Sequence, residues 1–182
     1  MLFIGEDDKI LCWPKSKISD CIQREGWDII SSDTLMPLRK QILTAQPIPQ
    51  CIPSFELSVK LSKIVEGDLV EIGLASEKDE FYYSFQTKDI YHHRKNAINS
   101  SSTTLVVNDI ARFFLRRVVV DKCIFNICHM SVNNQRVCGD AILQGNYVRP
   151  LISIKSPNVE VATSFGFNGA HQDISKFSIL LF

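Results

Sequence analysis

The chain has 182 residues, of which 45 % are hydrophobic and 22 % are charged, as in an ordinary globular protein. Lys and Arg together number 20, as do Asp and Glu, so no overall field attracts a phosphate backbone and nucleic acid is not an expected partner. No window holds the roughly 18 apolar residues of a membrane span, and the N-terminal MLFIGEDDKI turns acidic where a secretory signal would stay apolar. We therefore expect an intracellular protein, cytoplasmic or nuclear, that makes no contact with membranes.

The N-terminal region is mixed in character and is expected to form an arm. Pro14 would break an early helix, and Ser19 to Gln23 could form one short helical turn. We assign residues 1–24 to an arm packed on a domain that spans residues 25–182. The six cysteines are an even number, but nothing else marks an exported protein stapled by disulfides, so free thiols are expected.

The clearest local pattern lies at Phe55 to Leu61, where apolar and polar residues alternate with the two-residue period of a half-buried strand. A second apolar run, LVEIGLA, spans Leu69 to Ala75, and Gly67-Asp68 between the two runs is a turn signal. The sequence therefore predicts that the two runs pair as an antiparallel hairpin with one solvated face.

Further short strands are predicted along the rest of the chain. The segment Ile110 to Val120 could also mark a helix face, but its β-branched end favours a strand. Its Arg112, Arg116 and Arg117 are interpreted as charges that guard an edge strand. Strands that recur about every ten residues predict an all-β, two-sheet sandwich. The other predicted strands are Phe81–Phe85, Asp89–His92, Thr103–Val107, Lys122–His129, Tyr147–Ile154 and Val159–Phe165.

The segments FELSVKL, LVEIGLAS, CIFNICHMSVNNQRV and VRPLISIKSPNVEVATSFG follow one another in the order and spacing of a SPRY domain, and residues 26–182 resemble that family. Ala111 stands where the family has glycine, and Asn133-Asn134 replaces its Asn-Gly turn, so the chain resembles a divergent member. Asn is the residue other than glycine that best accepts a left-handed turn. The resemblance implies a bent antiparallel two-sheet β-sandwich of the concanavalin-like jelly-roll type.

In the SPRY family, loops at one end of the sandwich hold a short peptide or a loop of a partner protein. The resemblance therefore implies a non-enzymatic interaction module, an adaptor or substrate receptor in multiprotein assemblies that include ubiquitin ligases, with no cofactor. Carried over by position, the loops are Arg39–Gln46, Ser76–Tyr83 and Lys155–Asn158. Tyr82 and Tyr83 are the expected anchors, although strand alternation would bury one of them. The implied partner-binding residues are Arg39, Thr44, Gln46, Tyr82, Tyr83, Lys155, Ser156, Pro157 and Asn158.

Two clusters invite a metal or catalytic interpretation: His92-His93 with Asp89, and His129 beside Cys123 and Cys128. Neither completes a zinc ligand set, and in a strand Cys128 and His129 point to opposite faces, so we expect no metal site. No nucleophile elbow or phosphate-binding glycine loop is present, so no catalytic residue is assigned. An enzyme would need Asp89, His92 or His129 to converge with a nucleophile in one pocket.

Glycan binding is the alternative function, because two-sheet jelly rolls of similar outline serve as lectins. This alternative predicts an exposed aromatic side chain flanked by Asn, Asp, His or Arg on the concave face of one sheet. A glycan array without hits would count against it.

Overall fold

The computed structural model describes residues 21–24, 27–31, 42–44, 46–93, 95–96, 103–167 and 170–171. Arg39 and most of the expected N-terminal arm lie outside this part of the chain. Every element in the described residues is a strand, and each strand pair is antiparallel. No helix that could cross a membrane occurs there. The prediction of an all-β, two-sheet antiparallel sandwich is confirmed.

The larger sheet has nine strands. The order across it is β1-β2-β14-β4-β9-β10-β11, with β12 paired to β10 and β15 paired to β14. Its strands are β1 (Cys21–Arg24), β2 (Trp27–Ser31), β4 (Ser54–Lys63), β9 (Ile110–Val120), β10 (Cys123–Val132), β11 (Gln135–Arg136), β12 (Ala141–Leu143), β14 (Glu160–Phe167) and β15 (Ala170–His171).

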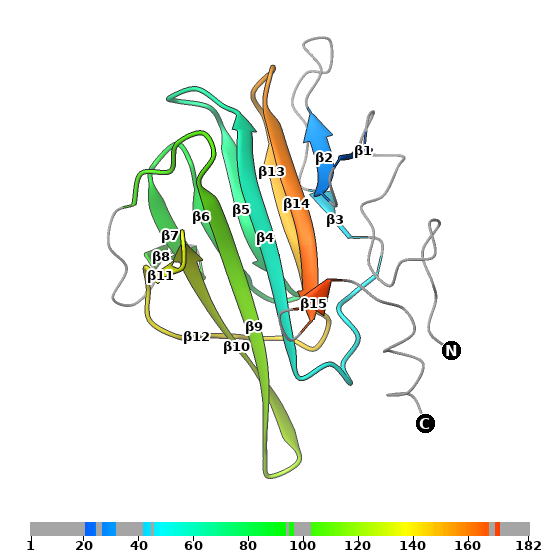
Figure 1. The fold of residues 1–182 in the computed structure, drawn as a ribbon. Helices are drawn as coiled ribbons and strands as arrows, with labels where there is room; N and C mark the ends of the chain where they lie inside the picture. The colour runs from blue at the N-terminus through cyan, green and yellow to red at the C-terminus, as the bar shows by residue number, and fades with distance from the viewer. Residues whose placement is uncertain are drawn as a thin grey trace.

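The smaller sheet has six strands in the order β3-β13-β5-β6-β7-β8. Figure 1 shows it as a second layer, with β5, β6 and β13 lying behind β4, β9 and β14. Its strands are β3 (Ile42–Leu43), β5 (Val70–Ala75), β6 (Glu80–Ser84), β7 (Asp89–His92), β8 (Lys95–Asn96) and β13 (Arg149–Ile154).

The hydrophobic core lies between the two sheets. The alternating residues of β4 explain why, because its apolar side chains are buried while Glu56 and Lys60 stay partly exposed on the other face. Across the core, Phe81 of β6 meets Phe113 of β9 edge to face, with ring centroids 6.3 Å apart. Each sheet therefore presents an outer face that takes no part in this core.

The predicted hairpin between Phe55–Leu61 and Leu69–Ala75 is wrong. Strand β4 pairs with β9 and β14, whereas β5 pairs with β6 and β13 in the other sheet. The chain crosses between the sheets through a turn in which Gly67 has a φ of 89° and the Asp68 Oδ2 accepts the Val65 N–H at 2.9 Å. This crossing lets the apolar faces of β4 and β5 meet across the core, which pairing within one layer would prevent.

Two other local predictions are also wrong. Where a helical turn is predicted at Ser19–Gln23, the described residues belong to strand β1, whose backbone groups pair with β2. Residues Thr103–Val107 form a loop rather than a strand. In that loop the Val106 N–H donates to the Asp109 Oδ2 at 2.9 Å, so a side chain replaces a neighbouring strand as the acceptor.

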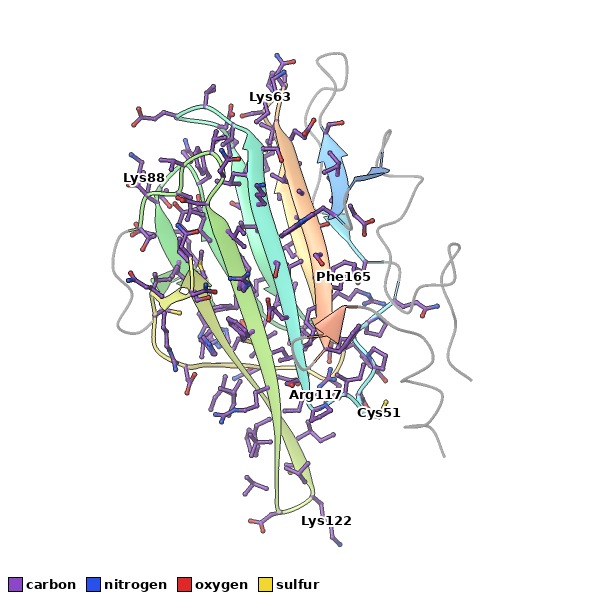
Figure 2. The ribbon with its side chains drawn as sticks, in the orientation of Figure 1. Cys51, Lys63, Lys88, Arg117, Lys122 and Phe165 are labelled. Carbon is purple, nitrogen blue, oxygen red and sulfur yellow. The ribbon has the colours of Figure 1, made fainter. Side chains whose placement is uncertain are left out.

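Strand β9 is not an edge strand, because β4 and β10 flank it. The hairpin of β9 and β10 extends beyond the rest of the sandwich, with Lys122 at its tip (Figure 2). Arg117 does not guard an edge either: its guanidinium donates to the backbone carbonyls of Ile48, Pro49 and Ile52. The interpretation of the three arginines as edge protection is therefore wrong.

Candidate functional site

The outer face of the nine-stranded sheet carries an aromatic side chain between charged ones. Phe114 of β9 lies directly opposite Glu56 of β4 on one side and His129 of β10 on the other. The neighbouring row of the sheet places Arg112 opposite Ser58 and Ser131. Side chains alternate along a strand. Phe113 and Leu115 point into the core, so Arg112 and Phe114 point away from it.

Phe114 and His129 stack on each other. Their ring centroids are 4.7 Å apart and their planes differ by 17°. The pKa of His129 is lowered, first by burial and then by the nearby Arg136, so the imidazole is neutral near pH 7. A neutral imidazole offers one donor and one acceptor nitrogen. Its Nδ1 lies 3.8 Å from the Asp140 Oδ1.

Two ion pairs hold the polar groups around this stacked pair. The Arg112 Nε lies 2.9 Å from the Glu56 Oε1, and the Arg112 Nη1 donates to the Asn134 Oδ1 at 2.6 Å. On the other side, Arg136 pairs with Asp140 and its Nε donates to the Cys138 carbonyl at 2.7 Å. The orientations of these groups are therefore set before any ligand arrives. We call the following set the outer-face patch: Glu56, Arg112, Phe114, His129, Asn134, Arg136 and Asp140.

Of the loops implied by the SPRY resemblance, the one that begins at Ser76 and the described part of Arg39–Gln46 lie at one end of the sandwich, because β13 residues Arg149 and Pro150 pair with Ala75 and Leu74 and the Pro150 carbonyl accepts the Thr44 N–H, whereas Lys155–Asn158 lies at the other end. Thr44 is buried, and its N–H donates to the Pro150 carbonyl at one end of β13. Its hydroxyl donates to the Gln46 carbonyl. Lys155, Ser156, Pro157 and Asn158 form the turn at the opposite end of β13, where Asn158 has a φ of 58°. The two sets of residues are thus separated by the length of that strand.

The two tyrosines of β6 are also divided. Tyr83 is 1 % exposed in the core, and its hydroxyl donates to the Thr103 carbonyl at 2.6 Å. Burial raises the pKa of Tyr83 to about 12. The Tyr83 side chain packs between the sheets and also contributes to the lining of the pocket at the end of the sandwich that carries Lys155. Tyr82 lies on the outer face of the six-stranded sheet, stacked on Tyr91 with ring centroids 5.3 Å apart.

The end of the sandwich that carries Lys155 does contain a pocket, of about 410 Å³. Ile64, Phe85, Leu105 and Val106 contribute to its lining. The turn of Lys155–Asn158 is tied to this end, because the Ser156 Oγ accepts the Leu69 N–H at 2.7 Å. Apolar side chains exposed at this end are Val65, Leu69, Val106 and Val107.

The histidine clusters differ from those that the sequence suggests. Asp89 begins β7 opposite Ser84, whereas the histidines lie at the other end of that strand. The carboxylate that meets His92 and His93 is Asp79, from the loop before β6. Sequence reasoning missed Asp79 because strand register, and not spacing along the chain, brings it there.

Cys128 and His129 point to opposite faces of β10, as predicted for a strand. Cys128 is fully buried and the Met130 N–H beside it donates to the Cys138 Sγ at 3.3 Å. Burial raises the pKa of the Cys128 thiol far above its usual range. A protonated, enclosed thiol is a core side chain and not a nucleophile.

No protein-family model matches the sequence, and no curated protein matches it. Solved structures with a similar arrangement include a bifunctional GH43-CE protein of Bacteroides eggerthii, with a TM-score of 0.45 and 11 % identity over 84 % of this chain. The chain spans 23 % of the length of that protein. An alginate lyase from Alteromonas sp. 272 has a TM-score of 0.37 and 9 % identity, covering 91 % of this chain and 97 % of the lyase. A functionally unknown protein from Saccharomyces cerevisiae has a TM-score of 0.37 and 11 % identity, covering 86 % and 96 %.

These similarities correct the prediction that the chain is not an enzyme. The GH43-CE protein and the alginate lyase are enzymes by their descriptions. At 11 % and 9 % identity the likeness concerns the fold alone. None of the three structures is described as a SPRY domain.

Proposed function

We propose that the protein binds a neutral oligosaccharide on the outer-face patch of the nine-stranded sheet. The observation that carries the proposal is the stacked pair of Phe114 and His129, set between the Glu56–Arg112 and Arg136–Asp140 ion pairs. The glycan alternative predicts an exposed aromatic side chain flanked by Asn, Asp, His or Arg on a concave face; Phe114 has such neighbours but is only partly exposed.

The chemistry of a sugar suits such a surface. A pyranose ring offers apolar C–H groups on its faces and hydroxyl groups around its edge. Phe114 supplies apolar contact, while Arg112, Asp140 and the neutral His129 supply donors and acceptors. Because the ion pairs already hold these groups, little ordering entropy is lost on binding.

The charges of the patch favour a neutral sugar over a polyanion. The side chains of Arg112 and Arg136 are matched by those of Glu56 and Asp140. Paired charges of this kind leave little net field to attract a chain of carboxylates or sulfates.

A glycan array followed by calorimetry tests the proposal. We expect one class of neutral oligosaccharide to bind, and Phe114→Ala and Arg112→Gln each to weaken binding at least about tenfold. Phe125→Ala is the matched control, because Phe125 is a 39 % exposed phenylalanine on the same hairpin outside the patch. Arg116→Gln is the control for charge, since Arg116 is exposed next to the patch.

The same samples show whether binding leads to reaction. Chromatography of the bound oligosaccharide before and after incubation would detect cleavage, and loss of cleavage in Phe114→Ala would place that activity on the patch. An array without hits, or binding that all four variants retain, would rule out the proposal.

A second candidate function, peptide recognition as in a SPRY domain, is favoured by the apolar end near Lys155. There the 410 Å³ pocket opens beside the exposed Val106 and Val107. Selection from a random peptide library, with Val106→Ser as the test variant and Val119→Ser on the distant hairpin as the control, would examine this role. Enriched peptides that bind both variants equally would eliminate it.

A further inference from the structure

The seam between the two sheets holds a cluster of donor atoms that the oligosaccharide proposal does not use. Asp79 lies in the loop between β5 and β6, and β12 packs against β6 there. The side chain of Asp79 is fully enclosed, whereas those of His92 and His93 are 16 % and 44 % exposed. The cluster therefore has a buried base and an accessible rim.

The three side chains converge on one point. The Asp79 Oδ2 lies 3.0 Å from the His92 Nε2, and the Asp79 Oδ1 lies 2.8 Å from the His93 Nδ1. One donor atom from each residue lies within 4.8 Å of the other two. In a tetrahedral shell with bonds of about 2.0–2.1 Å, neighbouring donors are about 3.3 Å apart. The two short O–N distances involve different oxygens of Asp79, and the three ligand atoms lie within 4.8 Å of one another, so an ion would draw them together by about 1.5 Å at most.

The backbone turns both histidines toward the same carboxylate. His92 ends β7, and His93 follows it with a φ of 54°, a left-handed conformation that histidine adopts more often than most residues do. The two ring centroids are 4.1 Å apart as a result.

Asp79 is itself held in position by the backbone. The Glu80 N–H donates to its Oδ1 at 2.8 Å, and the Gln144 N–H, just after β12, donates to its Oδ2 at 3.0 Å. Hydrogen bonds that fix a ligand carboxylate are a usual feature of metal sites, where they set the direction of the ligand.

We infer that Asp79, His92 and His93 form a binding site for a transition-metal dication, with Zn²⁺ as the best-fitting ion. Two imidazole nitrogens and one carboxylate suit Zn²⁺, whereas Ca²⁺ and Mg²⁺ prefer shells made of oxygen ligands. The bound ion takes the place of the two imidazole–carboxylate hydrogen bonds. Coordination leaves the ring protons on the His92 Nδ1 and the His93 Nε2.

A pocket of about 390 Å³ adjoins the rim of the cluster. His93 and Asp79 contribute to it, and its other lining residues are Ser76, Glu77, Lys78 and Glu80. Three protein ligands leave the fourth tetrahedral position free, as in zinc sites that bind water or a substrate oxygen. The pocket gives such a ligand access to that position.

Zinc titration of the whole chain tests the inference. With a chromophoric chelator as competitor, we expect one Zn²⁺ per chain at micromolar or lower Kd, and at least about tenfold weaker binding in His93→Ala and Asp79→Asn. Asp89→Asn is the matched control, because Asp89 lies at the opposite end of β7. It is expected to bind as the unmodified chain does. If Asp79→Asn fails to fold, the exposed His93→Ala still decides the result.

Nuclear magnetic resonance of the histidine side-chain nitrogens identifies the coordinating atoms. Zinc is expected to shift the Nε2 of His92 and the Nδ1 of His93. No binding to the intact chain, or equal affinity in His93→Ala, Asp79→Asn and Asp89→Asn, would overturn the site. These results do not depend on sugar binding, because the outer-face patch shares no residue with the cluster.

Discussion

Arg116 and Arg117 are adjacent in sequence and lie in opposite environments. Arg116 points outward from β9 and is exposed, whereas Arg117 points inward and donates to the carbonyls of Ile48 and Ile52. Burial lowers the pKa of Arg117. The guanidinium nevertheless remains charged at neutral pH, since the pKa of arginine starts above 12. The guanidinium thereby supplies hydrogen-bond donors to backbone carbonyls between Ile48 and Ile52, a segment that forms no strand.

This difference predicts different costs of substitution. Arg117→Met should lower the free energy of unfolding by about 2–4 kcal/mol, because several buried carbonyls lose their donor. Arg116→Met should change it by no more than about 0.5 kcal/mol. Urea unfolding of both variants measures the two values. Equal losses would show that Arg117 does not support the segment.

His129 makes stability depend on pH. Its pKa in the folded chain lies below the ordinary value near 6.5, so the unfolded chain binds the proton more readily. The contribution of His129 to the free energy of unfolding is fully present above about pH 6.5 and is lost as the pH falls through the lowered pKa. Between about pH 7.5 and pH 5, the free energy of unfolding should fall more in the unmodified chain than in His129→Gln. A larger fall in the variant would reverse the sign and refute the argument.

At the scale of elements, the buried face of a strand could be predicted from the sequence more reliably than the strands with which it pairs. The alternation of Phe55 to Leu61 correctly identified which side of β4 is buried. It could not show that β4 and β5 lie in different sheets, because an alternating strand has the same pattern in a hairpin and in a sandwich. The turn at Asn133-Asn134 was predictable, since both residues have positive φ and Asn accepts it.

The candidate sites were less predictable for the same reason. Phe114 and His129 meet because β9 and β10 pair in one register, and Asp79 meets His92 because β6 pairs with β7 and packs against β12. No short sequence motif indicates either of these strand registers. The loops of the SPRY resemblance were placed by order along the chain, and this order does not indicate which end of a strand each loop occupies.

The turn at the tip of the β9–β10 hairpin yields a further prediction. Asp121 and Lys122 have φ values of 49° and 65°, the pair of left-handed residues found in a type I′ turn. Lys122→Gly should therefore raise the free energy of unfolding by about 0.5–1 kcal/mol. Lys63→Gly at the end of β4 should lower it by a similar amount, because glycine weakens a strand. Destabilisation by both changes would contradict the assigned turn.

On the scale of the whole molecule, Phe113 and Phe114 separate the two roles of the nine-stranded sheet. Phe113 is fully buried and contacts Phe81 of the other sheet, whereas Phe114 belongs to the outer face. Phe113→Ala should destabilise the chain by about 3–5 kcal/mol by leaving a cavity between the layers. Phe114→Ala should cost about 1 kcal/mol and leave the fold intact. Thermal unfolding of the two variants makes the comparison, and similar losses would mean that the outer face is also core.

The two proposed sites thus lie at the two ends of one short strand, β12. Asp140, which belongs to the outer-face patch, precedes β12. Gln144 follows β12, and its backbone N–H donates to the Asp79 carboxylate. The core between the sheets fixes both positions without taking part in either site. A rigid arrangement of this kind is well suited to recognition, because the groups need no reordering when a ligand binds.

Mapping a bound neutral oligosaccharide on the isotope-labelled chain by nuclear magnetic resonance tests the central claim most directly. The expected result is that amide signals of Arg112, Phe114 and His129 move as the sugar is added, while those around Val106 and Lys155 stay in place. Shifts confined to the apolar end near Lys155, or no shifts with any sugar selected on the array, would contradict a binding site on the outer face of the nine-stranded sheet.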